Sequence, residues 1–145
     1  MKLFTIGFTK KTARDFFGLL QKSGVKRIVD VRLNNVSQIS GFAKKNDLAY
    51  FLEKICSVEY IHTPELSPTK KMLDDYKKRG GDWKTYEENF FSLMKERKVE
   101  NTLSKQIISE GCLLCSEHKP HHCHRRLVAE YLKHHWGNID VIHLK

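Results

Sequence analysis

The sequence has few of the residues that mark fibrous, disordered or disulfide-stapled chains. Its 145 residues include three prolines, eight glycines and four cysteines, and neither an internal repeat nor a low-complexity tract is present. No apolar run approaches the roughly 20 residues that a helix needs to cross a bilayer. The apolar stretch after Met1 is too short for a secretory signal peptide. We therefore expect one cytoplasmic domain over residues 1–145, with no membrane partner.

Acidic residues are also fewer than basic residues. The chain has 26 Lys and Arg against 17 Asp and Glu, a net charge of +9. This excess favours an anionic partner, either a small anionic ligand such as a nucleotide or, as the alternative, a nucleic acid. The basic residues are dispersed in short groups, such as Lys77–Arg79, and no group is long enough to predict a nucleic-acid-binding arm.

Short apolar segments alternate with segments of helical periodicity along the chain. Strands are predicted over 3–6, 27–32, 58–62, 111–115 and 140–144. The alternation predicts a single-domain, three-layer α/β fold, with a mostly parallel sheet and helices on both faces. Ligands bind such sheets beyond the carboxyl ends of the strands, so the residues at those ends are the candidate site.

Capping residues and helical spacing predict where the helices begin. Thr12 is expected to cap a helix that ends at Ser23–Gly24, and Ser67–Pro68 to open a later one. Asp82 is expected to cap a longer helix. Further helices are predicted over 48–55, 99–107 and 127–132. The aromatic residues of the helix after Asp82 recur at helical spacing, which favours a core role: Trp83, Tyr86, Phe90 and Phe91.

The segment 115–126 is the richest in chemically active side chains. It joins the fourth predicted strand to the last helix, whose unpaired N–H groups and dipole favour anions. Basic neighbours lower the pKa of a thiol placed there. We predict an anion-binding loop with a thiol nucleophile, Cys115 or Cys123, and with Glu117 as general acid or base. His124 and Arg125 are predicted to contact the ligand.

Two arginines in the first turn of a helix oppose its dipole, at a cost of roughly 0.3–1 kcal/mol each. A negative partner would offset this cost. We predict that Arg125 pairs with Glu117 and also faces a bound phosphate-like group. Arg126 is expected to lie on the solvent side.

The cysteines are expected to be free in a cytoplasmic protein. Cys56 and Cys112 are predicted to be buried and unreactive. A bond between Cys115 and Cys123 is the one exception that their common loop allows. Cys112 and Cys115 have half of a zinc-binding spacing, but residues three apart in a strand point to opposite faces. No cofactor and no metal are assigned, and a metal site of Cys115, Cys123 and a loop histidine remains an alternative.

The other candidates lie where predicted strands end. Gly7 ends the first strand and His62 ends the third. Asp30 and Arg32 lie on one face of the best strand, where the Arg32 guanidinium suits an anion clamp. The alternative is a structural pair of Asp30 with Arg32. We expect Arg32, Cys115 and the segment 123–125 to share one edge of the sheet.

Several of these motifs together resemble a known family. Thr5-Ile6-Gly7-Phe8, Val29-Asp30-Val31-Arg32, Glu65-Leu66-Ser67-Pro68, Leu114-Cys115-Ser116-Glu117 and Cys123-His124-Arg125-Arg126 resemble the DUF488 family over almost the whole chain. That family has no characterised function, so the resemblance implies a fold rather than a reaction. Phe8 and Ser67–Pro68 depart from its common pattern. The layout is also similar, more remotely, to rhodanese-like domains, in which a strand, a Cys loop and a helix bind an anion.

Overall fold

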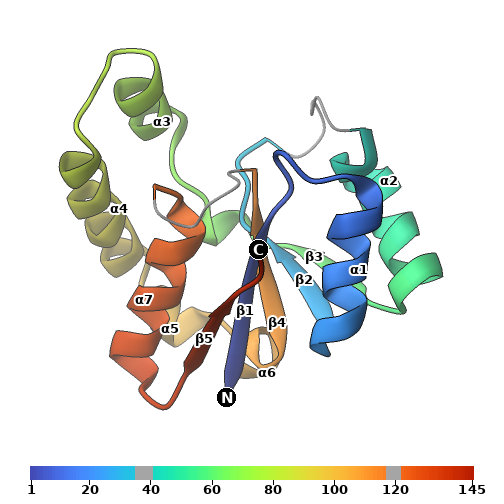
Figure 1. The fold of residues 1–145 in the computed structure, drawn as a ribbon. Helices are drawn as coiled ribbons and strands as arrows, with labels where there is room; N and C mark the ends of the chain where they lie inside the picture. The colour runs from blue at the N-terminus through green and yellow to red at the C-terminus, as the bar shows by residue number, and fades with distance from the viewer. Residues whose placement is uncertain (35–40, 117–121) are drawn as a thin grey trace.

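The computed structural model describes residues 1–34, 41–116 and 122–145. In these ranges five parallel strands form one sheet in the order β3-β2-β4-β1-β5 (Figure 1). They are β1 (Lys2–Gly7), β2 (Arg27–Asp30), β3 (Glu59–His62), β4 (Gly111–Cys115) and β5 (Asp140–His143). The all-parallel sheet confirms the predicted α/β class. Strand β2 ends at Asp30, two residues before the predicted end.

Helices cover both faces of the sheet, as predicted. They are α1 (Ala13–Ser23), α2 (Lys45–Phe51), α3 (Lys70–Lys77), α4 (Trp83–Arg97), α5 (Val99–Thr102), α6 (Lys105–Ile108) and α7 (His124–Trp136). A single π-helical turn, Leu52–Cys56, continues α2, and the predicted helix over 99–107 is two short ones. Figure 1 shows α1 and α2 on one side of the sheet and α4 and α7 on the other. No helix in the described ranges is long and apolar enough to cross a membrane.

Alternate side chains of the strands enter two separate cores, as the pleat of a strand requires. Cys112 and Leu114 of β4 pack with the core of α1 and α2. Leu113 and Cys115 pack with the core of α4 and α7. The structure therefore confirms that Cys112 and Cys115 face opposite sides of the sheet, and the two cannot bind one ion together.

One predicted helix start agrees with the structure and another does not. The Thr12 side chain accepts a hydrogen bond from the Asp15 N–H at 3.1 Å, which confirms the predicted cap. The prediction that Ser67–Pro68 opens a helix is wrong. Helix α3 begins at Lys70, and its cap is Thr69, which accepts from the Met72 N–H at 3.2 Å. Ser67 is buried instead, and its hydroxyl is used elsewhere.

Candidate functional site

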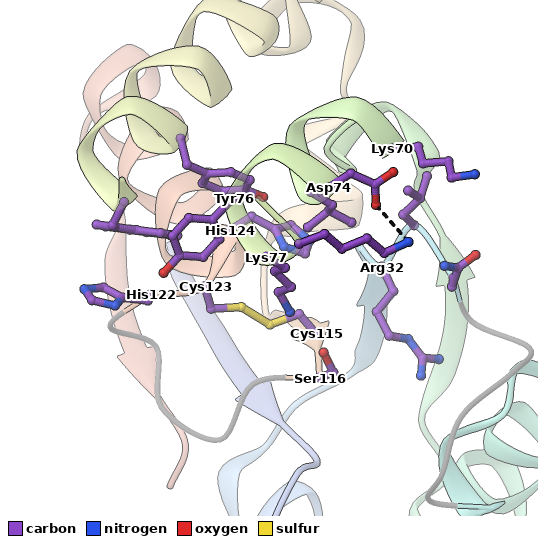
Figure 2. Close-up of a pocket in the computed structure, with 16 residues that line it drawn as sticks. Arg32, Lys70, Asp74, Tyr76, Lys77, Cys115, Ser116, His122, Cys123 and His124 are labelled. Atoms are coloured by element: carbon purple, nitrogen blue, oxygen red, sulfur yellow. Dashed lines mark ion pairs between the residues drawn. A yellow bond between two sulfur atoms is a disulfide. The ribbon is translucent and has the colours of Figure 1, made fainter. Parts of the chain in front are cut away.

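A cavity of about 720 Å³ opens at the carboxyl edge of the sheet. Its walls come from the residues after β2 and β4, from α3, and from the first residues of α4 and α7 (Figure 2). This size is typical of sites for small molecules. Arg32, Cys115, Cys123 and His124 all contribute to the lining, which confirms that these predicted residues share one edge.

Two cysteines from different elements meet in this cavity. Cys115 is the last residue of β4, and Cys123 is the N-cap residue of α7. The structure joins them in a disulfide (Figure 2). This bond is the one exception that the expectation of free cysteines allowed. Cys115 also pairs in register with Gly7 at the end of β1, so the predicted Gly7 lies beside the pair.

Arg125 packs directly against the two sulfur atoms. Its Nη1 lies 3.3 Å from the Cys115 Sγ and 3.9 Å from the Cys123 Sγ, and its Nε lies 3.4 Å from the Thr5 hydroxyl oxygen. The side chain is completely buried. Arg125 does not line the cavity, so its predicted contact with a bound phosphate-like group stays a prediction. Glu117, the predicted partner of Arg125 and candidate acid or base, lies outside the described residues.

The Arg126 side chain lies in a different environment from that of Arg125. It forms ion pairs with Glu130 at 2.9 Å and Glu87 at 3.5 Å, and its side chain is 27% exposed. The prediction of a side chain on the solvent side is thus only partly correct. The two carboxylates offset the repulsion between this cation and the helix dipole.

A further cation lies near Arg125. Among the described residues, the Lys11 ammonium nitrogen is buried with no hydrogen-bond partner. Burial, and then the charge of Arg125, lower the pKa of Lys11. Lys11 belongs to the segment between β1 and α1, at the same edge of the sheet. The Lys11 ammonium and the Arg125 guanidinium are therefore two buried basic groups close enough to repel each other.

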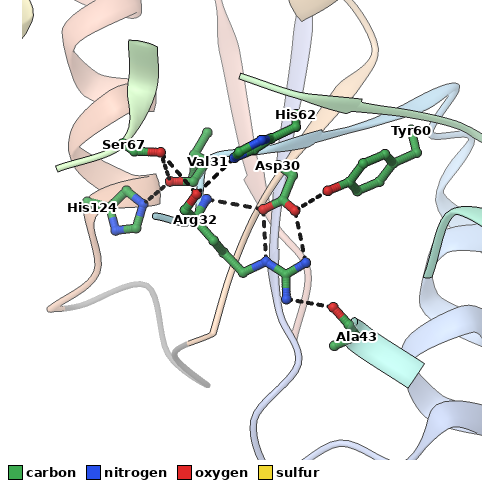
Figure 3. A network of polar contacts seen from close by, with 8 residues as sticks. All are labelled: Asp30, Val31, Arg32, Ala43, Tyr60, His62, Ser67 and His124. Carbon is green, nitrogen blue, oxygen red and sulfur yellow. Dashed lines mark hydrogen bonds and ion pairs between the residues drawn. The ribbon is translucent and has the colours of Figure 1, made fainter. Parts of the chain in front are cut away.

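His124 is held in one orientation by the backbone after β2. Its Nε2 lies 2.7 Å from the Val31 carbonyl oxygen (Figure 3), and because that oxygen can only accept, Nε2 carries the proton. Burial lowers the pKa of His124 to about 4, and the charges of Lys77 and Arg125 act in the same direction. The ring is therefore neutral near pH 7, with an unprotonated Nδ1.

Arg32 is engaged in a buried structural pair. Its Nε and Nη2 each donate to the Asp30 carboxylate at 2.9 Å, and its Nη1 donates to the Ala43 carbonyl at 2.7 Å (Figure 3). The Tyr60 hydroxyl also donates to Asp30. Arg32 is 3% exposed and Asp30 is fully buried. These contacts match the alternative, a structural pair of Asp30 with Arg32, and a ligand contact of Arg32 stays a prediction.

The carbonyls of residues 31 and 32 are held by side chains from three separate parts of the chain. Besides His124, the Ser67 hydroxyl lies 3.0 Å from both carbonyl oxygens. The ring Nε2 of His62 lies 3.1 Å from the Arg32 carbonyl oxygen (Figure 3). This network fixes the segment that follows β2, and it gives His62 a structural contact. The predicted ligand contact of His62 stays a prediction.

Sequence reasoning missed several side chains that line the cavity. Trp83, expected in the core, is partly buried and lines the cavity at the start of α4. Its ring stacks on His122, with 4.8 Å between centroids, and on Tyr86, with 5.1 Å. Lys70 and Lys77 of α3 also line the cavity. The only sequence signal for Trp83 was its place directly after the cap residue Asp82.

The remaining cysteines are free. Cys112 is buried, as predicted, but Cys56 is only half-buried, because it lies at the end of the turn that follows α2. Burial raises the pKa of both thiols.

Three residues at the cavity could hold a metal ion. One ligand atom each of Cys115, Cys123 and His124 lies within 4.8 Å of the other two.

The fold and this edge define a single-domain α/β protein with a ligand-sized cavity built on a Cys/His/Arg cluster. The chain belongs to the DUF488 family, because the family model described as "Domain of unknown function DUF488" matches residues 12–132. This match confirms the resemblance to that family. Comparison with curated proteins and with solved structures gave no match.

Proposed function

We propose that the cavity binds a phosphate-bearing ligand with a planar ring, of the chemical class of a nucleotide, and holds it against the Cys115–Cys123 pair. The observation that carries this proposal is the lining itself. Lysines of α3, a column of stacked rings and the two sulfur atoms all face one space of about 720 Å³.

The lysines supply the charge for a phosphate. Lys70 and Lys77 are seven residues apart, which places them on one face of α3. The charge of Lys78 is offset by Asp74 at 3.5 Å. In Figure 2 the Lys77 side chain points toward the disulfide, and its charge acts on His124. Lys77 is therefore the best-placed cation for a phosphate near the sulfur atoms.

The rings supply a surface for a base. His122, Trp83 and Tyr86 form a continuous stack, and a planar ring can extend such a column. Stacking of a base on an aromatic side chain stabilises complexes by about 1–3 kcal/mol. A ligand with both a ring and a phosphate should therefore bind more tightly than either part alone.

The sulfur atoms add thiol chemistry to the site. A small dithiol reduces the Cys115–Cys123 disulfide to two protein thiols and is itself oxidised to a cyclic disulfide. After reduction, iodoacetamide should alkylate one of these two thiols, with formation of a C–S bond and loss of iodide. We expect adenosine monophosphate to slow this alkylation at least tenfold and to leave that of Cys56 unchanged. Equal protection of Cys56 would contradict the proposal.

Calorimetry of the oxidised protein tests the ligand class. Adenosine monophosphate should bind more tightly than inorganic phosphate or adenosine. Lys77→Ala should weaken its binding at least tenfold, or about 1.4 kcal/mol. Lys71→Ala removes an exposed lysine of the same helix that does not line the cavity, and it should leave the affinity within twofold. Equal losses of affinity in the two variants would show that the ligand responds only to the overall positive charge of the protein. If only oligonucleotides bound, with an affinity that falls steeply as salt increases, the partner would be a nucleic acid.

A further inference from the structure

The geometry points to a second state of the cysteine pair, in which reduced Cys115 and Cys123 bind a zinc-class divalent ion together with His124. Ligand atoms of these three residues lie within 4.8 Å of one another. Two thiolates and an imidazole form the soft, mixed donor set that Zn²⁺ prefers. The two thiolate charges also balance the charge of the ion. This inference does not rest on the proposed nucleotide ligand.

The backbone spacing suits an ion between the sulfur atoms. The Cα atoms of Cys115 and Cys123 are 7.4 Å apart, whereas disulfides usually join Cα atoms about 4.4–6.8 Å apart. In a tetrahedral zinc site with bonds of about 2.3 Å, the two sulfur atoms are about 3.8 Å apart. The thiols can therefore open to hold an ion without a closer approach of their backbones.

His124 already has the arrangement of a metal ligand. Its Nε2–H donates to the Val31 carbonyl oxygen at 2.7 Å, which leaves Nδ1 as the nitrogen for coordination. Histidines that bind metals characteristically donate their other ring N–H to a carbonyl or carboxylate, which fixes the ring. The Ser67 hydroxyl lies 3.0 Å from the same carbonyl oxygen. The carbonyl that orients His124 is therefore itself held in place by a second hydrogen bond.

The cavity leaves room for one more ligand. Cys115, Cys123 and His124 all line it, and Cys112 is excluded because it faces the opposite core. Three protein ligands and one open position distinguish catalytic zinc sites from closed structural ones. A water molecule or a ligand oxygen entering from the cavity would complete the coordination.

Cobalt spectroscopy of the reduced protein tests the site. A phosphine reduces the disulfide to two thiols, and the phosphine takes up an oxygen atom from water. Co²⁺ should then bind with a stoichiometry of one, with a sulfur-to-cobalt charge-transfer band and the intense visible bands of a tetrahedral site. Cys123→Ser removes one of the two thiolates and should lower the charge-transfer intensity per cobalt, and His124→Ala should weaken binding at least about tenfold. The matched control, Cys56→Ser, should behave as wild type.

Absence of the charge-transfer band in reduced wild type, or a band of full wild-type intensity in Cys123→Ser, would overturn the inference. If the variants fail to fold by circular dichroism, the wild-type protein supplies a second readout. A mild disulfide-forming oxidant such as an azodicarboxamide, which accepts two electrons and two protons, should release bound Zn²⁺ as the disulfide forms. Retention of the zinc would also overturn the inference. Because nucleotide binding is measured on the oxidised protein without metal, the two proposals fail separately.

Discussion

The buried pair of Asp30 and Arg32 gives the sharpest test of how this edge is held together. Asp30→Asn keeps the shape of the side chain and removes its charge. The carboxylate accepts from the Arg32 backbone N–H at 3.1 Å, from the Arg32 guanidinium twice at 2.9 Å, and from the Tyr60 hydroxyl. The variant leaves a buried guanidinium without its counter-charge.

Removing one partner of a buried ion pair costs about 3–5 kcal/mol. This is a large part of the roughly 5–15 kcal/mol that stabilises a typical domain. Urea unfolding followed by circular dichroism measures the loss, and the slope of the transition should stay unchanged. Asp74→Asn is the control, because it breaks the more exposed pair with Lys78 and should cost at most about 1 kcal/mol. A loss as small for Asp30→Asn would refute the structural role of the pair.

Two further predictions concern single hydrogen bonds. Thr12→Ala removes the cap of α1 and should lower the free energy of unfolding by about 1 kcal/mol; a change below 0.3 kcal/mol, on the order of the error, would contradict the cap. Tyr60→Phe removes one donor to Asp30 and should cost about 1–2 kcal/mol, less than Asp30→Asn. The same urea titration checks both predictions. If Tyr60→Phe lost more free energy of unfolding than Asp30→Asn, the charge of Asp30 would not be the main contribution to the stability of the pair.

Local patterns were enough to predict most of the fold. The apolar run before Cys115 and the β-branched run before Asp30 predicted two central strands, and Thr12 predicted a helix cap that the structure confirms. These features depend on neighbours in sequence, since a cap involves residues three apart and a buried strand is apolar along its length. The common edge of Arg32 and Cys115 followed from the parallel sheet alone.

The roles of individual side chains depended on distant partners. Strand periodicity placed Asp30 and Arg32 on one face, but the strand ends at Asp30, and Arg32 turns back onto that carboxylate. The groups that complete the pair, Tyr60 and the Ala43 carbonyl, are 30 and 11 residues away from their partners. No spacing rule in one sequence could have identified them.

The aromatic residues of α4 show the same limit of prediction from one sequence. Helical periodicity correctly predicted that Tyr86 and Phe90 are buried. It could not show that Trp83, one turn earlier, lies where α4 begins and the cavity opens. Whether an apolar face meets the core or a cavity depends on the packing of other elements, which the period does not encode.

The most direct test of the central claim uses the two tryptophans of the chain as probe and control. Trp83 lines the cavity, whereas the Trp136 indole donates to the Glu100 carbonyl at 3.0 Å at the far end of α7. Adenosine monophosphate added to ¹⁵N-labelled protein should shift the indole N–H signal of Trp83, together with the amide signals of Lys77 and His124. The Trp136 signal should stay in place. A Trp83 signal that does not move, or equal movement of both indoles, would contradict a nucleotide site in this cavity.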